Sequence, residues 1–410
     1  MRPHVLILYQ HYRSPDCPAN VRVRSLLEVL RPHARLTLIT SDAWRRSRQT
    51  DRFAWFPDGV HAIEHAVPYA NRMSTPQRIR SYAAFAWAAL RKSLSLDDPP
   101  DLVYGISTPL STAAIAALVA RVYRVPWIFE LHDLWPSFPI QMGAVPFPWL
   151  ERLLYRGERA LYRSAAHVVT MSPDMTAHVE STGCPPDRVT TVLPGSDRSY
   201  LHSDAAPSPA HLRRQYNLPD GPVVLYAGTF GRANDIPTLI DVADRLQSEN
   251  ATFVFAGRGF FAPDLERLAR RNDAVVLVPP QPLHHMGSWY TLADVTLVPF
   301  IDRPVLATNS PAKFFDSLTM GTPVVVTNPG WTRTFVETHS CGWYVPPSRP
   351  AALASRLRSL LATPDVVRAA GERGRATARV RFNRRQQYEA IPHLVGRCLA
   401  QAAFSVATTH

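Results

Sequence analysis

The 410-residue chain has few of the residues that mark a disulfide-rich, zinc-binding or membrane-spanning protein. Its four cysteines, Cys17, Cys184, Cys341 and Cys398, lie far apart and form no CxxC pair, so neither a disulfide framework nor a zinc site is indicated. No apolar run approaches the roughly 20 residues that a membrane-spanning helix needs. The apolar run 4–8 is too short for the core of a signal peptide, which predicts a cytoplasmic protein.

Lysine is nearly absent, because Lys92 and Lys313 are the two lysines among 45 basic residues. The net charge of +12 favours an anionic partner such as a nucleic acid, a membrane surface or a phosphorylated substrate. The arginine bias, together with 38 prolines, is more typical of a GC-rich genome than of a particular function. In a chain whose usual cation is arginine, Lys313 is a candidate functional residue, and a chance surface lysine is the alternative.

The length exceeds one ordinary hydrophobic core, and an apolar fraction of 46% with 19% charged residues indicates a folded chain. Alternating apolar runs and amphipathic stretches predict an α/β protein with two doubly wound, Rossmann-like domains. We expect an N-terminal domain over 1–195, a Pro- and Ser-rich linker over 196–221 and a C-terminal domain over 222–385. Residues 386–410 are expected to form a helix that packs back on the first domain, and a tail.

Secondary structure follows from the apolar periodicity. Strands are predicted at 5–9, 36–40, 103–106, 127–131, 168–171, 222–227, 251–256, 275–278, 295–298 and 323–326. Helices are predicted at 21–30, 112–122, 149–165, 237–247, 263–271, 351–361 and 386–399. In this architecture ligands bind at the carboxyl ends of the strands, in a cleft that we expect the two domains to share.

The segment 309–326 carries the strongest local motif. Ser310 and Pro311 predict a helix start, with serine as the N-cap and proline at the first helical position. The free amides of that turn and the helix dipole form an anion site, to which Lys313 adds a full charge. Asp316 lies on the same helix face and could accept two hydrogen bonds from a ribose. A surface Lys–Asp pair on an ordinary αβ unit is the alternative.

Polar residues also follow other predicted strands. Glu130, His132 and Asp133 end the strand 127–131, where active sites of this architecture assemble, although a lone histidine there is more often structural. Glycine-containing turns follow the strands at 228–231 and 257–259, and neither matches the GxGxxG dinucleotide fingerprint. Each turn could bring backbone amides to a phosphate or simply connect a strand to a helix.

The segments 130–136, 226–231 and 310–316 resemble, in order and spacing, retaining glycosyltransferases of family 4, which have the GT-B fold. The likeness covers nearly the whole chain and is strongest to the branch that builds bacterial surface polysaccharides, including N-acetylfucosamine and colanic-acid transferases. It implies transfer of a hexose or N-acetylhexosamine from a nucleotide sugar, with a UDP-sugar expected, to a lipid-linked or small-molecule sugar acceptor. No cofactor and no metal are expected, and front-face attack is implied.

The resemblance implies that the domain over 1–195 binds the acceptor and the domain over 222–385 binds the nucleotide sugar. It also implies roles for particular residues. Expected catalytic residues are His132, Asp133 and Lys313. Expected acceptor residues are Asn20, Arg22 and Glu130. Expected nucleotide-sugar-binding residues are Thr229, Gly231, Arg232, Gly257, Arg258, Asn309, Ser310, Pro311, Ala312, Lys313 and Asp316.

The sequence departs from the family pattern at three places. These departures weaken the assignment of a donor sugar more than the assignment of the reaction class. Thr308 replaces the first glutamate of the usual Glu-x7-Glu motif, and Asp316 replaces the second. Asn234 and Asp235 occupy the neighbourhood of a lysine that many members carry after the first strand of the C-terminal domain. The first loop has the sequence Pro-Ala-Asn at 18–20 in place of a glycine pair.

Two stretches, 78–92 and 149–163, combine aromatic and apolar residues with cations, as interfacial helices do. They predict peripheral contact with the inner face of an anionic membrane, and a solvated face over a buried stripe is the alternative. Other functions remain open: transfer to a soluble natural product, sugar-nucleotide 2-epimerisation, and nucleic-acid binding. We expect no nucleic-acid partner, because the arginines are scattered and no RRM, zinc-finger or KH pattern is present.

Overall fold

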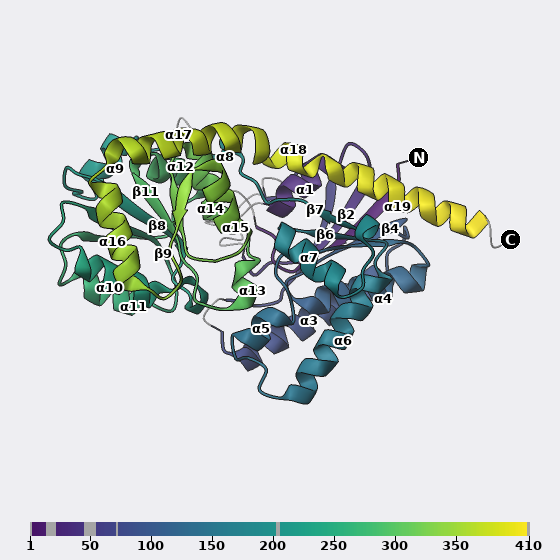
Figure 1. Cartoon of the computed structure of the whole chain (residues 1–410). Helices are drawn as coiled ribbons and strands as arrows, with labels where there is room; N and C mark the ends of the chain where they lie inside the picture. The colour runs from purple at the N-terminus through teal and green to yellow at the C-terminus, as the bar shows by residue number, and fades with distance from the viewer. Residues whose placement is uncertain (1, 14–21, 45–54, 71–72, 202–205, 408–410) are drawn as a thin grey trace. The chain divides into compact units, whose positions relative to one another are not determined.

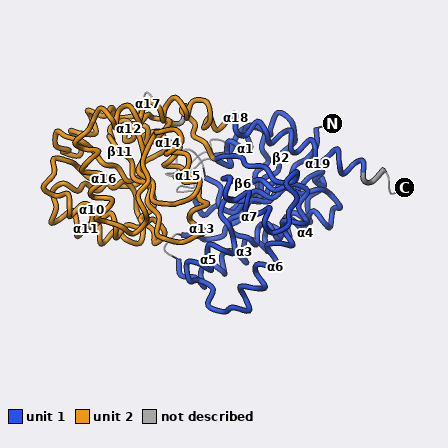
Figure 2. Tube along the Cα trace, viewed as in Figure 1, with its two compact units in different colours: residues 1–14, 21–193, 385–410 blue, residues 15–20, 194–384 orange. Residues whose placement is uncertain are grey.

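The computed structural model describes residues 2–13, 22–44, 55–70, 73–201 and 206–407. These fall into two compact units, coloured separately in Figure 2. Unit 1 takes the described segments up to residue 193 together with 385–407. Unit 2 takes the described residues of 194–384.

Unit 1 is built on a parallel sheet with seven strands in its described part, in the order β3-β2-β1-β4-β5-β6-β7. The strands are β1 (His4–Leu8), β2 (Arg35–Ser41), β3 (Val60–His65), β4 (Leu102–Ile106), β5 (Trp127–Glu130), β6 (His167–Thr170) and β7 (Val189–Thr191). The five inner strands were predicted because they are continuous apolar runs, typical of parallel strands covered on both faces. The two edge strands were not predicted, because β3 contains half-buried polar residues and β7 has only three residues.

The helices of unit 1 include a C-terminal pair that returns to it from unit 2 (Figure 1). They are α1 (Arg22–Leu30), α3 (Thr75–Ser93), α4 (Leu110–Tyr123), α5 (Ser137–Gln141), α6 (Pro148–Ser164), α7 (Pro173–Ser181), α18 (Arg384–Tyr388) and α19 (Ala390–Ala407). The single helix predicted at 386–399 is two helices that meet at Glu389, and α19 packs against α1.

Unit 2 contains a second parallel sheet, with six strands in its described part, in the order β10-β9-β8-β11-β12-β13. The strands are β8 (Val223–Thr229), β9 (Thr252–Arg258), β10 (Val275–Val278), β11 (Val295–Val298), β12 (Val324–Val326) and β13 (Gly342–Tyr344). Alternate residues of β8 enter two different apolar clusters: Val224 and Tyr226 join one, Val223 and Leu225 the other. The sheet is therefore buried on both faces, as a doubly wound sheet requires.

The helices of unit 2 include two short ones inside the stretch predicted as a linker. They are α8 (Arg198–Leu201), α9 (Pro209–Gln215), α10 (Ile236–Arg245), α11 (Ala262–Ala269), α12 (Leu283–Leu292), α13 (Pro304–Ala307), α14 (Ala312–Met320), α15 (Trp331–His339), α16 (Pro350–Leu361) and α17 (Pro364–Arg381). Leu201 and Leu212 belong to the apolar core of unit 2, so this stretch is packed rather than a free connection. At Gly287 of α12 a Cβ would lie 1.9 Å from Leu201 O, which shows how closely α8 approaches.

Close packing between β4 and α4 gives a prediction for stability. A Cβ added at Gly105 would lie 2.5 Å from the Cβ of Ala116, so Gly105→Ala should lower the free energy of unfolding by about 1–3 kcal/mol. The matched control is Gly157→Ala on α6, where a Cβ meets nothing within 4 Å. Because alanine is the better helix former, this control should raise the free energy by about 0.5–1 kcal/mol. Urea unfolding followed by circular dichroism checks both, and an unchanged midpoint for Gly105→Ala would contradict the packing argument.

Candidate active site

Lys313 lies in the first turn of α14, close to the carboxyl end of β8 in unit 2. Its side chain is only 9% exposed, and its Nζ lies 4.0 Å from the centre of the Tyr226 ring. A Cβ added at Gly228 would come within 3.2 Å of this Nζ. Gly228 also has φ of +138°, which favours glycine. The lysine head group thus occupies space that the glycine turn leaves open.

The ammonium group of Lys313 contacts an aromatic ring rather than an anion of the described residues. Among those residues Lys313 Nζ makes no ion pair or hydrogen bond, and it lies over the face of the Tyr226 ring. Burial lowers the pKa of Lys313 to about 7. The N-terminus of α14 adds the positive end of a helix dipole and amides without partners inside the helix. A buried cation beside such a terminus is suited to binding an anionic ligand.

The start of α14 differs from the prediction by one residue. The helix begins at Ala312, and Pro311 is the N-cap with ψ of 134°, so the assignment of Ser310 as N-cap and Pro311 as the first helical residue is wrong. Proline fixes φ but leaves ψ free, so it fits the extended N-cap position as well as the first helical one. Ser310 is buried, and Asn309 precedes it with its carbonyl accepting a hydrogen bond from Trp331.

Asp316 lies one turn beyond Lys313 on the buried face of α14. Its carboxylate accepts a hydrogen bond of 2.6 Å from Ser196 Oγ. Burial raises the pKa of Asp316 to about 6, although Arg384 and the Ser196 hydrogen bond oppose the shift. The partner Ser196 could not be foreseen from the motif. Contact between Asp316 and a ribose stays a prediction.

The two glycine turns lie next to each other, because β8 and β9 are paired through Thr229 and Arg258. A Cβ at Gly257 would lie 1.9 Å from Gly228 O, so this position accepts only glycine without movement of the chain. Gly231 is the N-cap of a short 3-10 helix, Arg232–Asn234. Exposed side chains at this edge of the sheet include those of Thr229, Arg232, Arg258 and Phe260.

In unit 1, Glu130 is the centre of a buried hydrogen-bond network at the end of β5. Its Oε1 accepts hydrogen bonds from Arg22 Nε at 2.9 Å and His132 Nε2 at 3.0 Å, and its Oε2 accepts one from Tyr104 OH at 2.5 Å. Burial alone would raise the pKa of Glu130, but Arg22 and the bonds from His132 and Tyr104 outweigh it and lower the pKa to about 2. The carboxylate is therefore ionised at every physiological pH.

This network changes the roles expected for Arg22 and Glu130. Both side chains are buried, at 2% and 0% exposure, and are engaged with each other, so the structure does not place them to touch an acceptor. It supports a positioning role, because an ionised Glu130 fixes the proton of His132 on Nε2 and leaves Nδ1 as the acceptor of the ring. Burial also lowers the pKa of His132, which keeps the ring neutral. Asn20 lies outside the described residues.

Asp133 follows His132 and is partly exposed. Its Oδ2 accepts a hydrogen bond of 3.1 Å from Thr108 Oγ1. Burial raises the pKa of Asp133 to about 6 against the effect of that bond. A carboxyl group that titrates just below neutral pH at the carboxyl edge of a parallel sheet can exchange protons with a substrate hydroxyl.

A cluster of partly exposed aromatic side chains surrounds this edge of unit 1 and was not predicted. His11 is central, with its ring centre 4.4 Å from that of Tyr69, 6.3 Å from Trp44 and 6.3 Å from Tyr82. Tyr9 connects the cluster to the site, because its ring lies 5.4 Å from His132. Tyr9 directly follows β1, and His11, Trp44 and Tyr69 lie within four residues of the ends of β1, β2 and β3. This position is the one signal that could have identified them.

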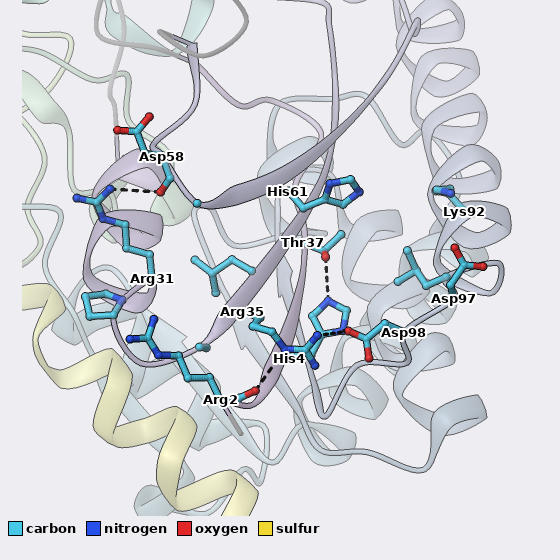
Figure 3. A pocket seen from close by; sticks show the side chains of 15 residues that line it. Arg2, His4, Arg31, Arg35, Thr37, Asp58, His61, Lys92, Asp97 and Asp98 are labelled. Atoms are coloured by element: carbon cyan, nitrogen blue, oxygen red, sulfur yellow. Dashed lines mark hydrogen bonds and ion pairs between the residues drawn. The ribbon is translucent and has the colours of Figure 1, made fainter.

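A cavity of about 730 Å³ opens at the opposite, amino edge of the sheet in unit 1 (Figure 3). It is lined by the first residues of β1 and β2, His4 and Arg35. In this cavity Arg35 forms an ion pair with Asp98, and His4 Nε2 lies 2.8 Å from Thr37 Oγ1. None of the predicted site residues lines this cavity.

Two further searches covered the described residues only. None of the described helices is both long and apolar enough to cross a membrane. In the described segments, no three His, Cys, Asp or Glu side chains come together in a way that could hold a metal ion.

Each of the two units matches a family model of glycosyltransferase domains. Residues 19–195 match the model of the Glycosyl transferase 4-like domain, and residues 221–363 match that of Glycosyl transferases group 1. The chain is 29% identical over 258 residues to a D-inositol 3-phosphate glycosyltransferase of Xylanimonas cellulosilytica, a match covering 60% of this chain and only 60% of that relative. It is 24% identical over 336 residues to the putative colanic acid biosynthesis glycosyl transferase WcaI of Escherichia coli, covering 78% of this chain and 80% of the other.

The solved structure of Anabaena HepE in complex with UDP-glucose superposes with a TM-score of 0.67 at 16% identity, covering 99% of this chain and all of that one. This likeness concerns the fold and, with the two parallel sheets, confirms the predicted GT-B class. The two family models together account for well over half of the residues. The chain therefore belongs to the glycosyltransferases of the family 4 type.

Proposed function

We propose that the protein transfers a hexose or N-acetylhexosamine from a nucleotide sugar to an acceptor hydroxyl, with retention of the anomeric configuration. The observation that carries the proposal is Lys313, a buried amine without an anion among the described residues, at the N-terminus of α14. A diphosphate is the part of a nucleotide sugar that would complete this site. A UDP-sugar is the expected donor, in keeping with the UDP-glucose bound by HepE.

The chemistry assigned to unit 2 is stabilisation of a leaving group. As the bond between the anomeric carbon and the phosphate oxygen breaks, its electron pair and negative charge pass to the diphosphate. Lys313, the amides of α14 and Arg232 are the groups proposed to stabilise that charge. The acceptor oxygen bonds to the anomeric carbon on the same face, and its proton passes to the departing phosphate oxygen. Because side chains supply the positive charge, the proposal includes no metal.

The chemistry assigned to unit 1 is binding and orientation of the acceptor. Nδ1 of His132, as a hydrogen-bond acceptor, and the carboxyl group of Asp133 can orient sugar hydroxyls. The aromatic rings of Tyr69 and Tyr82 offer apolar faces with hydroxyl edges, a combination that suits a pyranose. Surface-polysaccharide or glycolipid synthesis is the proposed setting, in keeping with the likeness to WcaI.

An anionic membrane is the proposed location of the acceptor. Helices α3 and α6 both pack against α4 and expose large apolar side chains: Ile79 (61%), Trp87 (68%), Trp149 (64%) and Leu153 (57%). Exposed arginines lie on the same two helices: Arg80, Arg91, Arg152 and Arg156. Helix α3 contains no acidic residue, and of the two glutamates of α6, Glu158 is buried and Glu151 is partly exposed. This mixture of apolar and cationic groups complements an anionic lipid surface.

The first test is turnover of a panel of UDP-, GDP- and dTDP-sugars with sugar acceptors, followed by mass spectrometry and NMR of the product anomer. Lys313→Met should lower kcat/KM by about 10²–10³-fold, because one stabilising donor to the leaving group is lost. Lys92→Met removes the other lysine of the chain and should leave turnover unchanged. Chelation with EDTA should also have no effect. Equal rates for Lys313→Met and the wild type, or donor epimerised without any acceptor, would contradict the proposal.

Binding of UDP should take up protons near neutral pH. Lys313 must be cationic to bind phosphate, and with a pKa of about 7 it loses its proton as the pH rises. The affinity should therefore fall above pH 7, by at most about tenfold per pH unit. Calorimetry in buffers with different ionisation heats measures the uptake. Lys313→Met should bind weakly, without this dependence between pH 7 and 9, and a flat wild-type profile would exclude the role.

Sedimentation with vesicles tests the membrane proposal. The protein should bind vesicles of phosphatidylglycerol and phosphatidylcholine at low salt, and far less to pure phosphatidylcholine. Replacing Trp87 and Trp149 by serine should weaken binding at least about tenfold, because two interfacial anchors are lost. Val380→Ser on α17, which is 77% exposed, is the matched control and should bind normally. If the wild type stays in the supernatant at low salt, the membrane proposal fails.

A further inference from the structure

The turns that follow β8 and β9 in unit 2 are joined around Phe230. The Phe230 amide donates to Arg258 O at 2.9 Å, and the Phe261 amide donates to Phe230 O at 3.0 Å. Gly259 allows this approach, because a Cβ there would lie 2.5 Å from Phe230 O and its φ is +159°. The two turns therefore form one connected rim at the carboxyl edge of the sheet.

Phe260 projects from this rim and is 60% exposed. A single exposed phenylalanine is ordinary on a protein surface. Here, however, the guanidinium carbon of Arg232 lies 4.3 Å from the centre of the Phe260 ring, which is a cation–π contact. Arg232 makes no hydrogen bond or ion pair with any other described residue, so the Phe260 ring is the group that restrains it.

We infer that Phe260 is a positioning residue for the nucleotide-sugar donor, because its ring holds the Arg232 guanidinium at the edge of the sheet where the diphosphate binds. The inference rests on the proposed function, in which Arg232 contacts that diphosphate.

Two physical arguments support this role. A ring contact uses none of the five N–H donors of a guanidinium, so Arg232 keeps its hydrogen-bonding capacity for phosphate oxygens. A free arginine side chain on the surface samples many rotamers, and ordering it on binding lowers affinity. When Phe260 restrains Arg232 before the ligand arrives, that cost is reduced. The connection through Phe230 keeps the two turns at the spacing that the contact needs.

Calorimetric binding of UDP by the full chain tests the inference without an acceptor. Phe260→Leu keeps an apolar side chain but removes the aromatic face, and it should weaken UDP binding by about two- to fivefold. Phe260→Tyr keeps the face and should bind like the wild type. Arg232→Met should weaken binding at least as much as Phe260→Leu. In the Arg232→Met background, Phe260→Leu should cause no further loss, because the two side chains act as one unit.

The outcomes separate the inference from the proposed function. The positioning role is overturned if Phe260→Leu or Arg232→Met binds UDP with wild-type affinity. It is also overturned if Phe260→Leu still weakens binding in the Arg232→Met background. UDP binding by the wild type would stand in each of these cases. Failure of Phe260→Tyr to retain affinity also overturns it. If the wild type binds none of UDP, GDP and dTDP, the proposed function fails, and the inference with it.

Discussion

The candidate active site depends on one constraint, a lysine head group enclosed without an anion among the described residues to balance it. The Lys313 ammonium lies over the Tyr226 ring and against Gly228, where an added Cβ would come within 3.2 Å of it. Burying a charge is costly unless it is paired, so proteins seldom retain an unpaired one without a functional reason. The lowered pKa of Lys313 is the measurable consequence of that cost. The proposed diphosphate would offset that cost by supplying the missing charge.

Each unit contains a buried charged side chain, but the surroundings of the two side chains differ. The difference separates a charged group with a structural role from one suited to binding a ligand. In unit 1, Glu130 receives hydrogen bonds from Arg22, His132 and Tyr104, so its charge is satisfied within the fold. Such a group can fix the orientation of a neighbouring side chain, and it is enclosed by the partners that satisfy its charge. In unit 2, the Lys313 ammonium makes no hydrogen bond or ion pair with any described residue. This contrast is why the proposal gives the chemistry to His132 and Lys313 and a supporting role to Arg22 and Glu130.

The inner strands of both sheets could be predicted from the sequence, because parallel strands buried on both faces are continuous apolar runs. The sequence was insufficient for the edge strands β3 and β13, which are half-buried or short and lack that pattern. Lys313 could be identified because lysine is rare in this chain and a helix start surrounds it. The ion pair between Glu130 and Arg22 could not be identified, because Arg22 is 108 residues away in the sequence. The aromatic cluster could not be predicted for the same reason, since its members come from separate loops and from α3.

The two cations proposed to meet the diphosphate are ordered by different means, and the difference follows from where each lies. Lys313 is ordered by burial, which fixes its position but lowers its pKa and makes its charge depend on pH. Arg232 lies in solvent, where its charge is permanent but its position is not fixed by packing. An aromatic ring is the one kind of apolar surface that attracts a guanidinium without occupying its donors, and Phe260 provides it. A permanent charge held by a ring thus complements a titratable charge held by the core, and together they would keep the diphosphate site cationic on both sides of neutral pH.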